Sequence, residues 1–174
     1  MPTPERTSVE EIVAAGREIL EASGAGGLTM QAVATRVGVR APSLYKRLRD
    51  RDALFAAVAA ATIDALTARL EAAGDDLEAI AHAYRDFARD HPEGFRIMFT
   101  SAAPHDALER SAAPLIRAAA AQVGEDDALD AARLVTAWAN GFLQMELSGA
   151  FRLGGDVDRA FEYGLRRLTA SLAA

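Results

Sequence analysis

The sequence predicts an all-α protein of about nine helices. Its 174 residues are 51% hydrophobic but only 6% aromatic, and alanine alone supplies 40 of them. Alanine, leucine, arginine and glutamate favour helices, whereas the β-branched and aromatic residues that favour strands are scarce. Helix-capping residues, glycines and prolines divide the chain into segments. We expect an N-terminal three-helix domain followed by a C-terminal helical bundle.

Two helices are expected before residue 40. Ser8 and Glu11 have the spacing of a capping box, and the helix that they start ends at the glycine-rich stretch 24–27. Thr29 caps a second helix of about two turns. Gly38 ends that helix, because glycine readily adopts the left-handed conformation found at helix ends.

The next two helices follow with little separation. A short third segment begins near Ala41, has Pro42 in its first turn, where a proline costs no hydrogen bond, and continues through Leu48. Asp50 then caps a long fourth helix that runs to Gly74.

The remaining helices are separated by brief breaks. One is expected over 76–90, a short apolar one starts at Pro92, and an alanine-rich one covers 104–123. Because Pro114 lies inside the last of these, it is either two pieces or one kinked helix.

Acidic residues at 125–130 start the penultimate helix, which runs to about Phe151, and Asp156 caps the last one.

The charge of the chain is unevenly distributed. The formal net charge is -6, but it is +1 over residues 1–55 and -7 over the rest. Residues 36–51 contain one acidic residue, Asp50, and six basic ones: Arg36, Arg40, Lys46, Arg47, Arg49 and Arg51. This cluster lies on the second of two short helices joined by a tight turn and on the exits from that helix, the arrangement of a DNA-binding helix-turn-helix. The alternative is a solvated helix face.

Several classes of site are excluded by the residues present. The absence of cysteine removes disulfides, thiolate metal sites and cysteine nucleophiles. The three histidines are far apart, and we find no nucleophile elbow, phosphate-binding loop or dinucleotide-binding glycine pattern. No apolar run reaches the roughly 20 residues of a membrane span. We therefore expect a cytoplasmic protein that is not an enzyme and has no metal, cofactor or membrane partner.

Residues 28–54, LTMQAVATRVGVRAPSLYKRLRDRDAL, resemble the DNA-binding segment of TetR family regulators. The shared features are threonine at the head of the second helix, Ala-x-x-x-Gly-Val across the turn, Leu-Tyr in the recognition helix and a basic-acidic pair opening the fourth helix. The resemblance implies a DNA-binding domain over 5–65, with its helix-turn-helix at about 28–47. It also implies a ligand-sensing and dimerisation domain over 75–174.

The resemblance implies two kinds of DNA contact. Phosphates would be bound from the second, recognition and fourth helices by Thr29, Tyr45, Lys46 and Arg51. Base edges would be read from the leading end of the recognition helix by Arg40, Ala41, Pro42 and Ser43. Arg47 could serve either class. Leu44, Leu48, Val33 and Val37 are expected in the three-helix core.

The C-terminal part resembles the regulatory domain of one TetR subgroup, the WHG type, in which histidine usually stands where this chain has Asn140. The resemblance implies an effector pocket lined by Tyr84, Phe87, Phe95, Met98, Phe99, Trp138 and Asn140, with His82 or His91 as further polar partners. It also implies a dimer interface that includes Val135, Phe142, Met145, Phe161, Leu165 and Leu168. For both sets the alternative is plain intramolecular core.

The sequence thus predicts a homodimeric transcriptional regulator, a repressor that a small-molecule effector releases from double-stranded operator DNA. The alternative is a helical protein-interaction or lipid-binding module whose basic segment is merely solvated.

Overall fold

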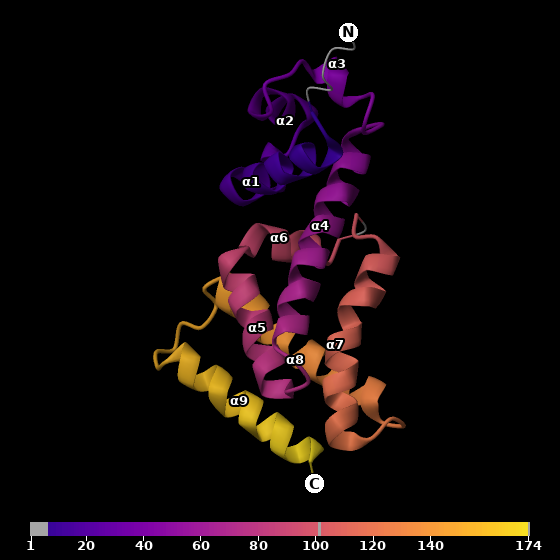
Figure 1. The fold of residues 1–174 in the computed structure, drawn as a ribbon. Coiled ribbons are helices and arrows are strands. Elements are labelled where there is room, and N and C mark those ends of the chain that lie inside the picture. The colour runs from indigo at the N-terminus through magenta and orange to yellow at the C-terminus, as the bar shows by residue number, and fades with distance from the viewer. Residues whose placement is uncertain (1–6, 101, 174) are drawn as a thin grey trace. The chain divides into compact units, whose positions relative to one another are not determined.

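The structure is a computed structural model that describes residues 7–100 and 102–173. The prediction of an all-α fold is confirmed, because the described residues form nine helices and no strand (Figure 1). The helices are α1 (Val9–Gly27), α2 (Met30–Arg36), α3 (Ala41–Leu44), α4 (Arg51–Ala72), α5 (Leu77–Asp90), α6 (Pro92–Ile97), α7 (His105–Val123), α8 (Ala128–Leu147) and α9 (Val157–Leu172).

These helices form two compact units, and neither is a continuous stretch of chain. The first unit contains the residues up to 65 together with 91–108, and the second contains 66–90 and 109–174. Helix α6 therefore belongs to the first unit although it follows α5 of the second, and α4 contributes to both.

The N-terminal helix caps are those that the sequence predicts. Ser8 and Glu11 form a reciprocal capping box, with the Glu11 amide donating to Ser8 Oγ at 3.1 Å and the Ser8 amide donating to Glu11 Oε2 at 2.9 Å. Gly24 interrupts α1 with φ 66°, at the start of the predicted break. The Thr29 hydroxyl accepts from the Ala32 amide at 3.1 Å and so starts α2.

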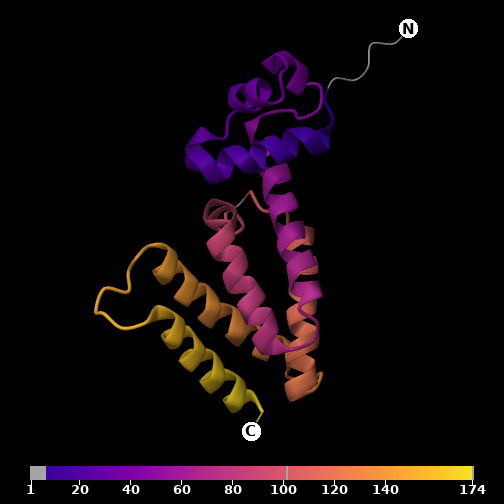
Figure 2. The same cartoon turned by 60° about the vertical axis from the view of Figure 1, so that its left-hand side comes forward.

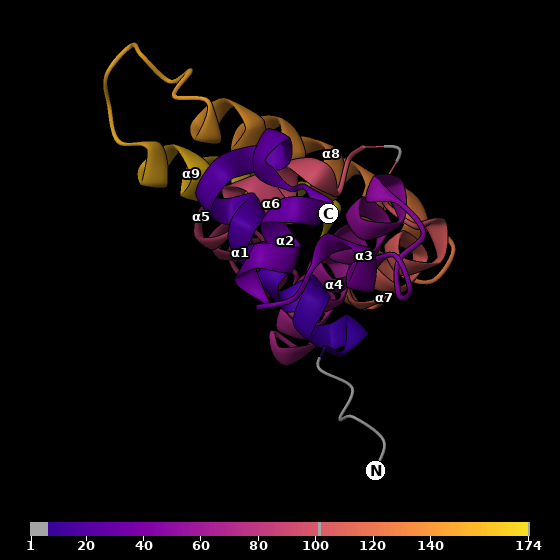
Figure 3. The same cartoon turned by 90° about the horizontal axis from the view of Figure 1, so that it is seen from above.

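A single apolar core holds α1 to α4 of the first unit together. Helix α2 packs on α1 and α3 packs on α2 (Figure 3). The buried side chains come from all four helices and from α6, and include Ile12, Leu20, Val33, Leu44, Leu54, Val58 and Ile97. Gly16 lets α1 approach α4 closely, because a Cβ atom there would lie 2.7 Å from Val58 Cγ2.

Helix α6 is fastened to α1 through its own N-terminus. The Glu21 carboxylate of α1 accepts hydrogen bonds from the backbone amides of Glu93 at 3.1 Å and Gly94 at 2.8 Å. On its other side Gly94 lies against α4, since a Cβ atom there would be 3.0 Å from Thr62 Cγ2. Two amides that a helix N-terminus leaves without intrahelical acceptors are thereby satisfied.

In the second unit α5 packs against α8 and α9, and α8 and α9 run side by side (Figure 2). Phe161 and Leu165 are buried there with Ala81, and Trp138 and Phe142 pack around them. Asp76 and Asp156 cap α5 and α9 with their carboxylates, and for Asp156 this cap was predicted. Helix α7 is one helix that contains Pro114, so the two-piece alternative is wrong.

Of the described helices, only α4 is long and apolar enough to span a membrane by length and composition. Its side chains have other partners: Leu54 and Val58 are fully buried in the core of the first unit. Leu66 and Leu70, which belong to the second unit, are buried as well. A helix in a protein core is apolar because its side chains pack against the rest of the protein.

Candidate nucleic-acid interface

The turn between α2 and α3 is tight and depends on Gly38. This residue has φ +74°, in the left-handed region that favours glycine. Its amide donates to the carbonyl of Thr35 at 3.3 Å, and the Val39 amide donates to the carbonyl of Ala34 at 2.9 Å. The chain therefore reverses directly after α2 and starts α3 at Ala41.

Helix α3 is shorter than predicted. It ends at Leu44, and turns replace the expected continuation to Leu48. The amides of Arg47 and Leu48 both donate to the carbonyl of Leu44 at 2.8 Å, so the backbone tightens there. Asp50 then caps α4 with its carboxylate, which accepts from the Ala53 amide at 2.8 Å.

The apolar and polar residues of this segment separate onto two faces. Leu44 and Leu48 are buried, as is Val33, and these core predictions are confirmed, while Val37 is half-buried. Ala41 and Thr29 are also half-buried. The other residues predicted to contact DNA are exposed: Arg40, Pro42, Ser43, Tyr45, Lys46, Arg47 and Arg51.

Ion pairs neutralise part of the basic cluster. Arg36 pairs with Glu18, and Arg49 pairs with Asp50 at 2.7 Å. The Ala53 amide and then the Arg49 guanidinium hold the pKa of Asp50 below its ordinary value, because both hydrogen bonds favour the carboxylate. Arg40 and Lys46 make no ion pair with any residue that the structure describes.

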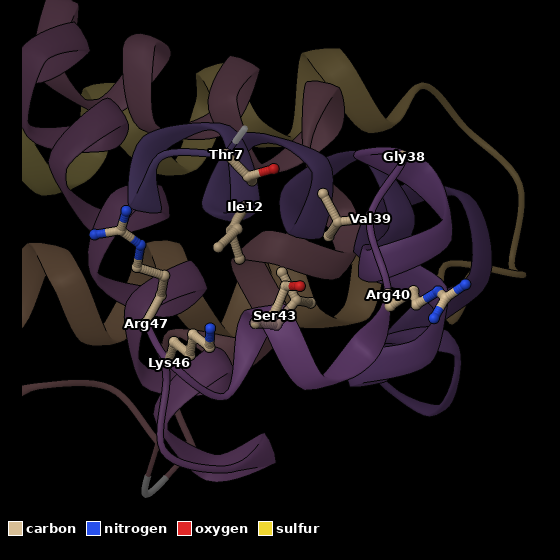
Figure 4. Close-up of a pocket in the computed structure, with 9 residues that line it drawn as sticks. Thr7, Ile12, Gly38, Val39, Arg40, Ser43, Lys46 and Arg47 are labelled. Carbon is tan, nitrogen blue, oxygen red and sulfur yellow. The ribbon is translucent and has the colours of Figure 1, made fainter. Parts of the chain in front are cut away.

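The exposed cations surround a hollow of about 960 Å³ between the start of α1 and α3. Its lining consists of Thr7, Ile12, Gly38, Val39, Arg40, Ser43, Leu44, Lys46 and Arg47. Figure 4 shows Lys46 and Arg47 on one side, Arg40 on the other, and Ile12 and Val39 between them. Four of the predicted contact residues thus meet at one surface, which has an apolar floor and basic edges.

Arg51 differs from the other cations of the cluster. Its Nε donates to the carbonyl of Leu28 at 3.2 Å, and its Nη2 donates to the carbonyl of Ala25 at 3.0 Å. The guanidinium also lies 4.4 Å from the ring centroid of Phe55. The two carbonyls lie at the end of α1 and directly before the α2 cap residue Thr29, a contact that sequence patterns do not reveal.

The residues predicted to line an effector pocket are divided between the two units. Phe95 and Met98 are buried in the first unit, where Phe99 is half exposed and meets the Phe95 ring edge-on at 5.2 Å.

The second unit holds the other four predicted pocket residues: Tyr84, Phe87, Trp138 and Asn140. The Tyr84 hydroxyl donates to Asn140 Oδ1 at 2.6 Å, and burial raises the pKa of Tyr84. Tyr84 and Asn140 therefore form a polar pair among the apolar side chains of this unit.

The residues predicted at a dimer interface also fall into two groups. Val135, Phe161 and Leu165 are buried within the single chain, Phe142 and Leu168 are half-buried, and Met145 is 46% exposed. Leu134 on α8 and Tyr163 on α9 are exposed apolar residues that the sequence analysis did not select. Leu134 lies about three helical turns before Met145 on the same face of α8, and this spacing is the signal that would have found it.

Two family models match the chain. The model of bacterial regulatory proteins of the tetR family covers residues 12–58, and that of the tetracyclin repressor-like C-terminal domain covers residues 77–168. The chain belongs to the TetR family. The first of the two matched ranges contains the helix-turn-helix and its exposed cations, and the second contains the packed helices α5 and α8 and most of α9.

Known proteins and solved structures resemble the chain over most of its length. The uncharacterized HTH-type transcriptional regulator Rv0681 of Mycobacterium tuberculosis is 29% identical over 97% of this chain and 83% of its own. The crystal structure of BioQ of Mycobacterium smegmatis has a TM-score of 0.70 and 29% identity over 96% of this chain and 98% of its own. A TetR variant of Acinetobacter baumannii AYE in complex with minocycline has a TM-score of 0.71 and 25% identity over 95% and 96%.

TetR family proteins are DNA-binding transcriptional regulators, typically repressors with a ligand-binding C-terminal domain. They bind operator DNA, dimerise and bind small molecules. This chain is accordingly a DNA-binding transcriptional regulator. Within the part of the chain that the structure describes, no group of histidine and acidic side chains is placed to hold a metal ion.

Proposed function

We propose that this TetR family chain is a homodimeric repressor that works in the cytoplasm and leaves its operator when a small molecule occupies the second unit. The observation that carries the proposal is the surface around α3. There, exposed cations and hydroxyls gather at one hollow while two of the neighbouring arginines are neutralised by carboxylates. Positive charge is thus concentrated where α3 would meet a duplex.

The proposed DNA contacts are of two kinds, to phosphates and to base edges. Lys46, Tyr45 and Thr29 donate to phosphates; the Thr29 hydroxyl accepts from a backbone amide and keeps its own proton to donate. Arg40 and Ser43 at the start of α3 read base edges, and Arg40 has the geometry to bind a guanine with two hydrogen bonds. Ala41 and Pro42 supply apolar contact to a thymine methyl, and Arg47 serves either class.

The second copy of the chain binds the outward face of α8 and α9. That face carries Leu134 and Met145 on α8 and Tyr163 on α9, which are about half exposed. Gly141 lies on the same face, and a Cβ atom there would meet nothing within 4 Å. Phe142 and Leu168 extend this face at its edges, while Val135, Phe161 and Leu165 support it from the core. A two-fold dimer would place two recognition helices about 34 Å apart.

The effector binds in the second unit near Tyr84 and Asn140, a partly buried polar pair with Phe87 and Trp138 in the same unit. Phe95, Met98 and Phe99, the other residues that the sequence predicts for this pocket, lie in the first unit. The minocycline complex of the Acinetobacter protein supports a small-molecule site in a fold of this kind. A ligand that binds better to the state with low operator affinity shifts the population toward that state.

A mobility-shift titration tests the DNA-binding part of the proposal. The probe is the promoter region beside the chain's own gene, and the competitor is a scrambled duplex of the same length. We expect specific retardation that weakens steeply between about 50 and 200 mM salt, since phosphate contacts release counterions. Absence of retardation at low salt would contradict the proposal and favour a protein-interaction or lipid-binding module.

A further inference from the structure

Two backbone carbonyls hold the guanidinium of Arg51, a residue of the basic cluster. The two acceptors, Ala25 and Leu28, lie at the end of α1 and directly before the α2 cap residue Thr29. Arg51 itself is the first residue of α4. One side chain therefore joins the start of α4 to the segment from which α2 begins.

The geometry suits arginine in particular. Its Nε and Nη2 donors point in fixed directions, so one guanidinium can bind two carbonyls that lie three residues apart in the chain. The Phe55 ring, one turn further along α4, lies against the same guanidinium at 4.4 Å and restricts its rotation. A lysine at this position would keep the charge but would present a single nitrogen.

These contacts affect the position of the recognition helix. Thr29 starts α2, and α3 follows α2 through the tight turn at Gly38. Fixing the segment before Thr29 to the first turn of α4 holds both ends of the α2–α3 pair on the same helix, since α3 leads into α4 within seven residues.

We infer that Arg51 is a positioning residue for the helix-turn-helix and not a phosphate ligand. The inference rests on the proposed function for its consequence in DNA binding, but the structural part stands without it. It replaces the phosphate role that the family resemblance implies for this residue.

The test compares Arg51→Lys and Arg51→Ala with the wild-type chain on two duplexes. One duplex is recovered with the wild-type protein from a random-sequence pool, and the other is its scrambled counterpart. Affinity is measured over a range of salt concentrations. Arg49→Lys is the matched control, because Arg49 is an exposed arginine of the same segment whose ion-pair partner is its neighbour Asp50. Lys46→Ala shows what the loss of a phosphate contact looks like in the same assay.

We expect Arg51→Lys to lower affinity for the selected duplex about three- to tenfold. The single lysine nitrogen cannot make both of the hydrogen bonds that the arginine Nε and Nη2 make. Affinity for the scrambled duplex should change less, and the slope of log affinity against log salt should stay at the wild-type value. Lys46→Ala should instead reduce that slope by about 0.9. Full activity of Arg51→Lys, together with a slope reduced by about 0.9 in Arg51→Ala, would overturn the inference in favour of a phosphate contact.

Hydrogen exchange provides a readout that does not depend on DNA. Arg51→Lys should speed amide exchange over residues 25–33 and leave α5, α8 and α9 unchanged, whereas Arg49→Lys should change neither. A variant that lowers the melting temperature without selective exchange at 25–33, and with unchanged affinity, would show a merely structural role. If the wild-type chain selects no duplex, the proposed function fails, and the exchange pattern alone still decides the role of Arg51.

Discussion

Arg85 on α5 donates two hydrogen bonds to Glu146 on α8, from Nε to Oε2 at 3.0 Å and from Nη2 to Oε1 at 2.7 Å. The Arg85 side chain is only 5% exposed, and its Nη2 also reaches Asp158 on α9 at 2.8 Å. Three helices of the second unit are thus joined at one guanidinium. The same guanidinium lies 4.4 Å from the centroid of the Phe161 ring.

Replacing Arg85 with methionine should lower the free energy of unfolding by about 3 kcal/mol, because Glu146 would be left largely buried with a weaker partner. Urea denaturation measures the change. Arg89→Met is the control, since Arg89 contacts the same two carboxylates from a side chain that is 41% exposed. It should cost about 1 kcal/mol or less. Equal losses in the two variants would refute the special role of the buried arginine.

The pH dependence of stability should reflect Glu146. Burial alone raises the pKa of this carboxyl, but hydrogen bonds from Arg85 and Arg89 outweigh burial and hold the pKa below its ordinary 4.5. A carboxyl whose pKa is lower in the folded state stabilises the protein fully above its unfolded pKa and loses that contribution as the pH falls through the folded pKa. As the pH is lowered from about 6 to about 3, the free energy of unfolding should therefore decrease more steeply for the wild-type chain than for Glu146→Gln. Parallel curves would show that Glu146 does not contribute.

Glu21→Ala should loosen α6 without unfolding the protein. The substitution removes the acceptor for the amides of Glu93 and Gly94, and loss of such a cap typically costs about 1 kcal/mol. Hydrogen exchange should accelerate at these two amides. Glu21→Gln retains a carbonyl acceptor and should protect them better. Unchanged exchange in Glu21→Ala would mean that the cap contributes little in solution.

Substitution by alanine should have opposite effects on stability at two glycines of neighbouring helices. At Gly164 on α9 a Cβ atom would lie 2.6 Å from Trp138 Cζ2, so Gly164→Ala should destabilise the chain by about 1–3 kcal/mol. Gly141 on α8 is open, and Gly141→Ala should stabilise the helix by up to about 1 kcal/mol. If α8 forms the dimer face, Gly141→Ala should also weaken dimerisation in sedimentation measurements. An unaltered dimer would place the interface elsewhere.

Lys46→Ala and Arg40→Ala should affect DNA binding differently. Loss of the Lys46 ammonium should weaken binding to all sequences alike, whereas loss of Arg40 should relax the preference at one base pair and cost about 1–3 kcal/mol on the best site. Selection from a random-sequence pool with each variant reports the preference. Arg49→Ala is the control, because Arg49 is exposed and paired with Asp50. Equal effects of Lys46→Ala and Arg40→Ala on a scrambled duplex would contradict the assignment.

Local features of the fold could be predicted from the sequence because their determinants lie within a few residues. The caps at Ser8, Thr29, Asp76 and Asp156 each use a side chain that bonds to amides two or three positions away. The end of α2 at Gly38 has the same character. The length of α3 was not predicted correctly. Its apolar residues Leu44 and Leu48 are spaced as in a helix, but the same spacing also fits a short helix followed by turns.

Contacts between distant segments could not be predicted in this way. Arg85 and Glu146 are 61 positions apart, and nothing in either local pattern marks them as partners. The hydrogen bonds of Arg51 were missed for another reason: their acceptors are backbone carbonyls, which every residue carries. Partners and exposure together decide whether a cation in a basic cluster is available to DNA.

The attachment of α6 to α1 has a practical consequence for hybrid regulators. An exchange that grafts residues 1–65 onto the C-terminal part of another regulator would leave Glu21 opposite a foreign α6, without the glycine that fits at position 94. Residues 91–108 belong to the same compact unit and should be transferred with the DNA-binding helices. The natural module for exchange in this protein is therefore assembled from two separate stretches of the gene.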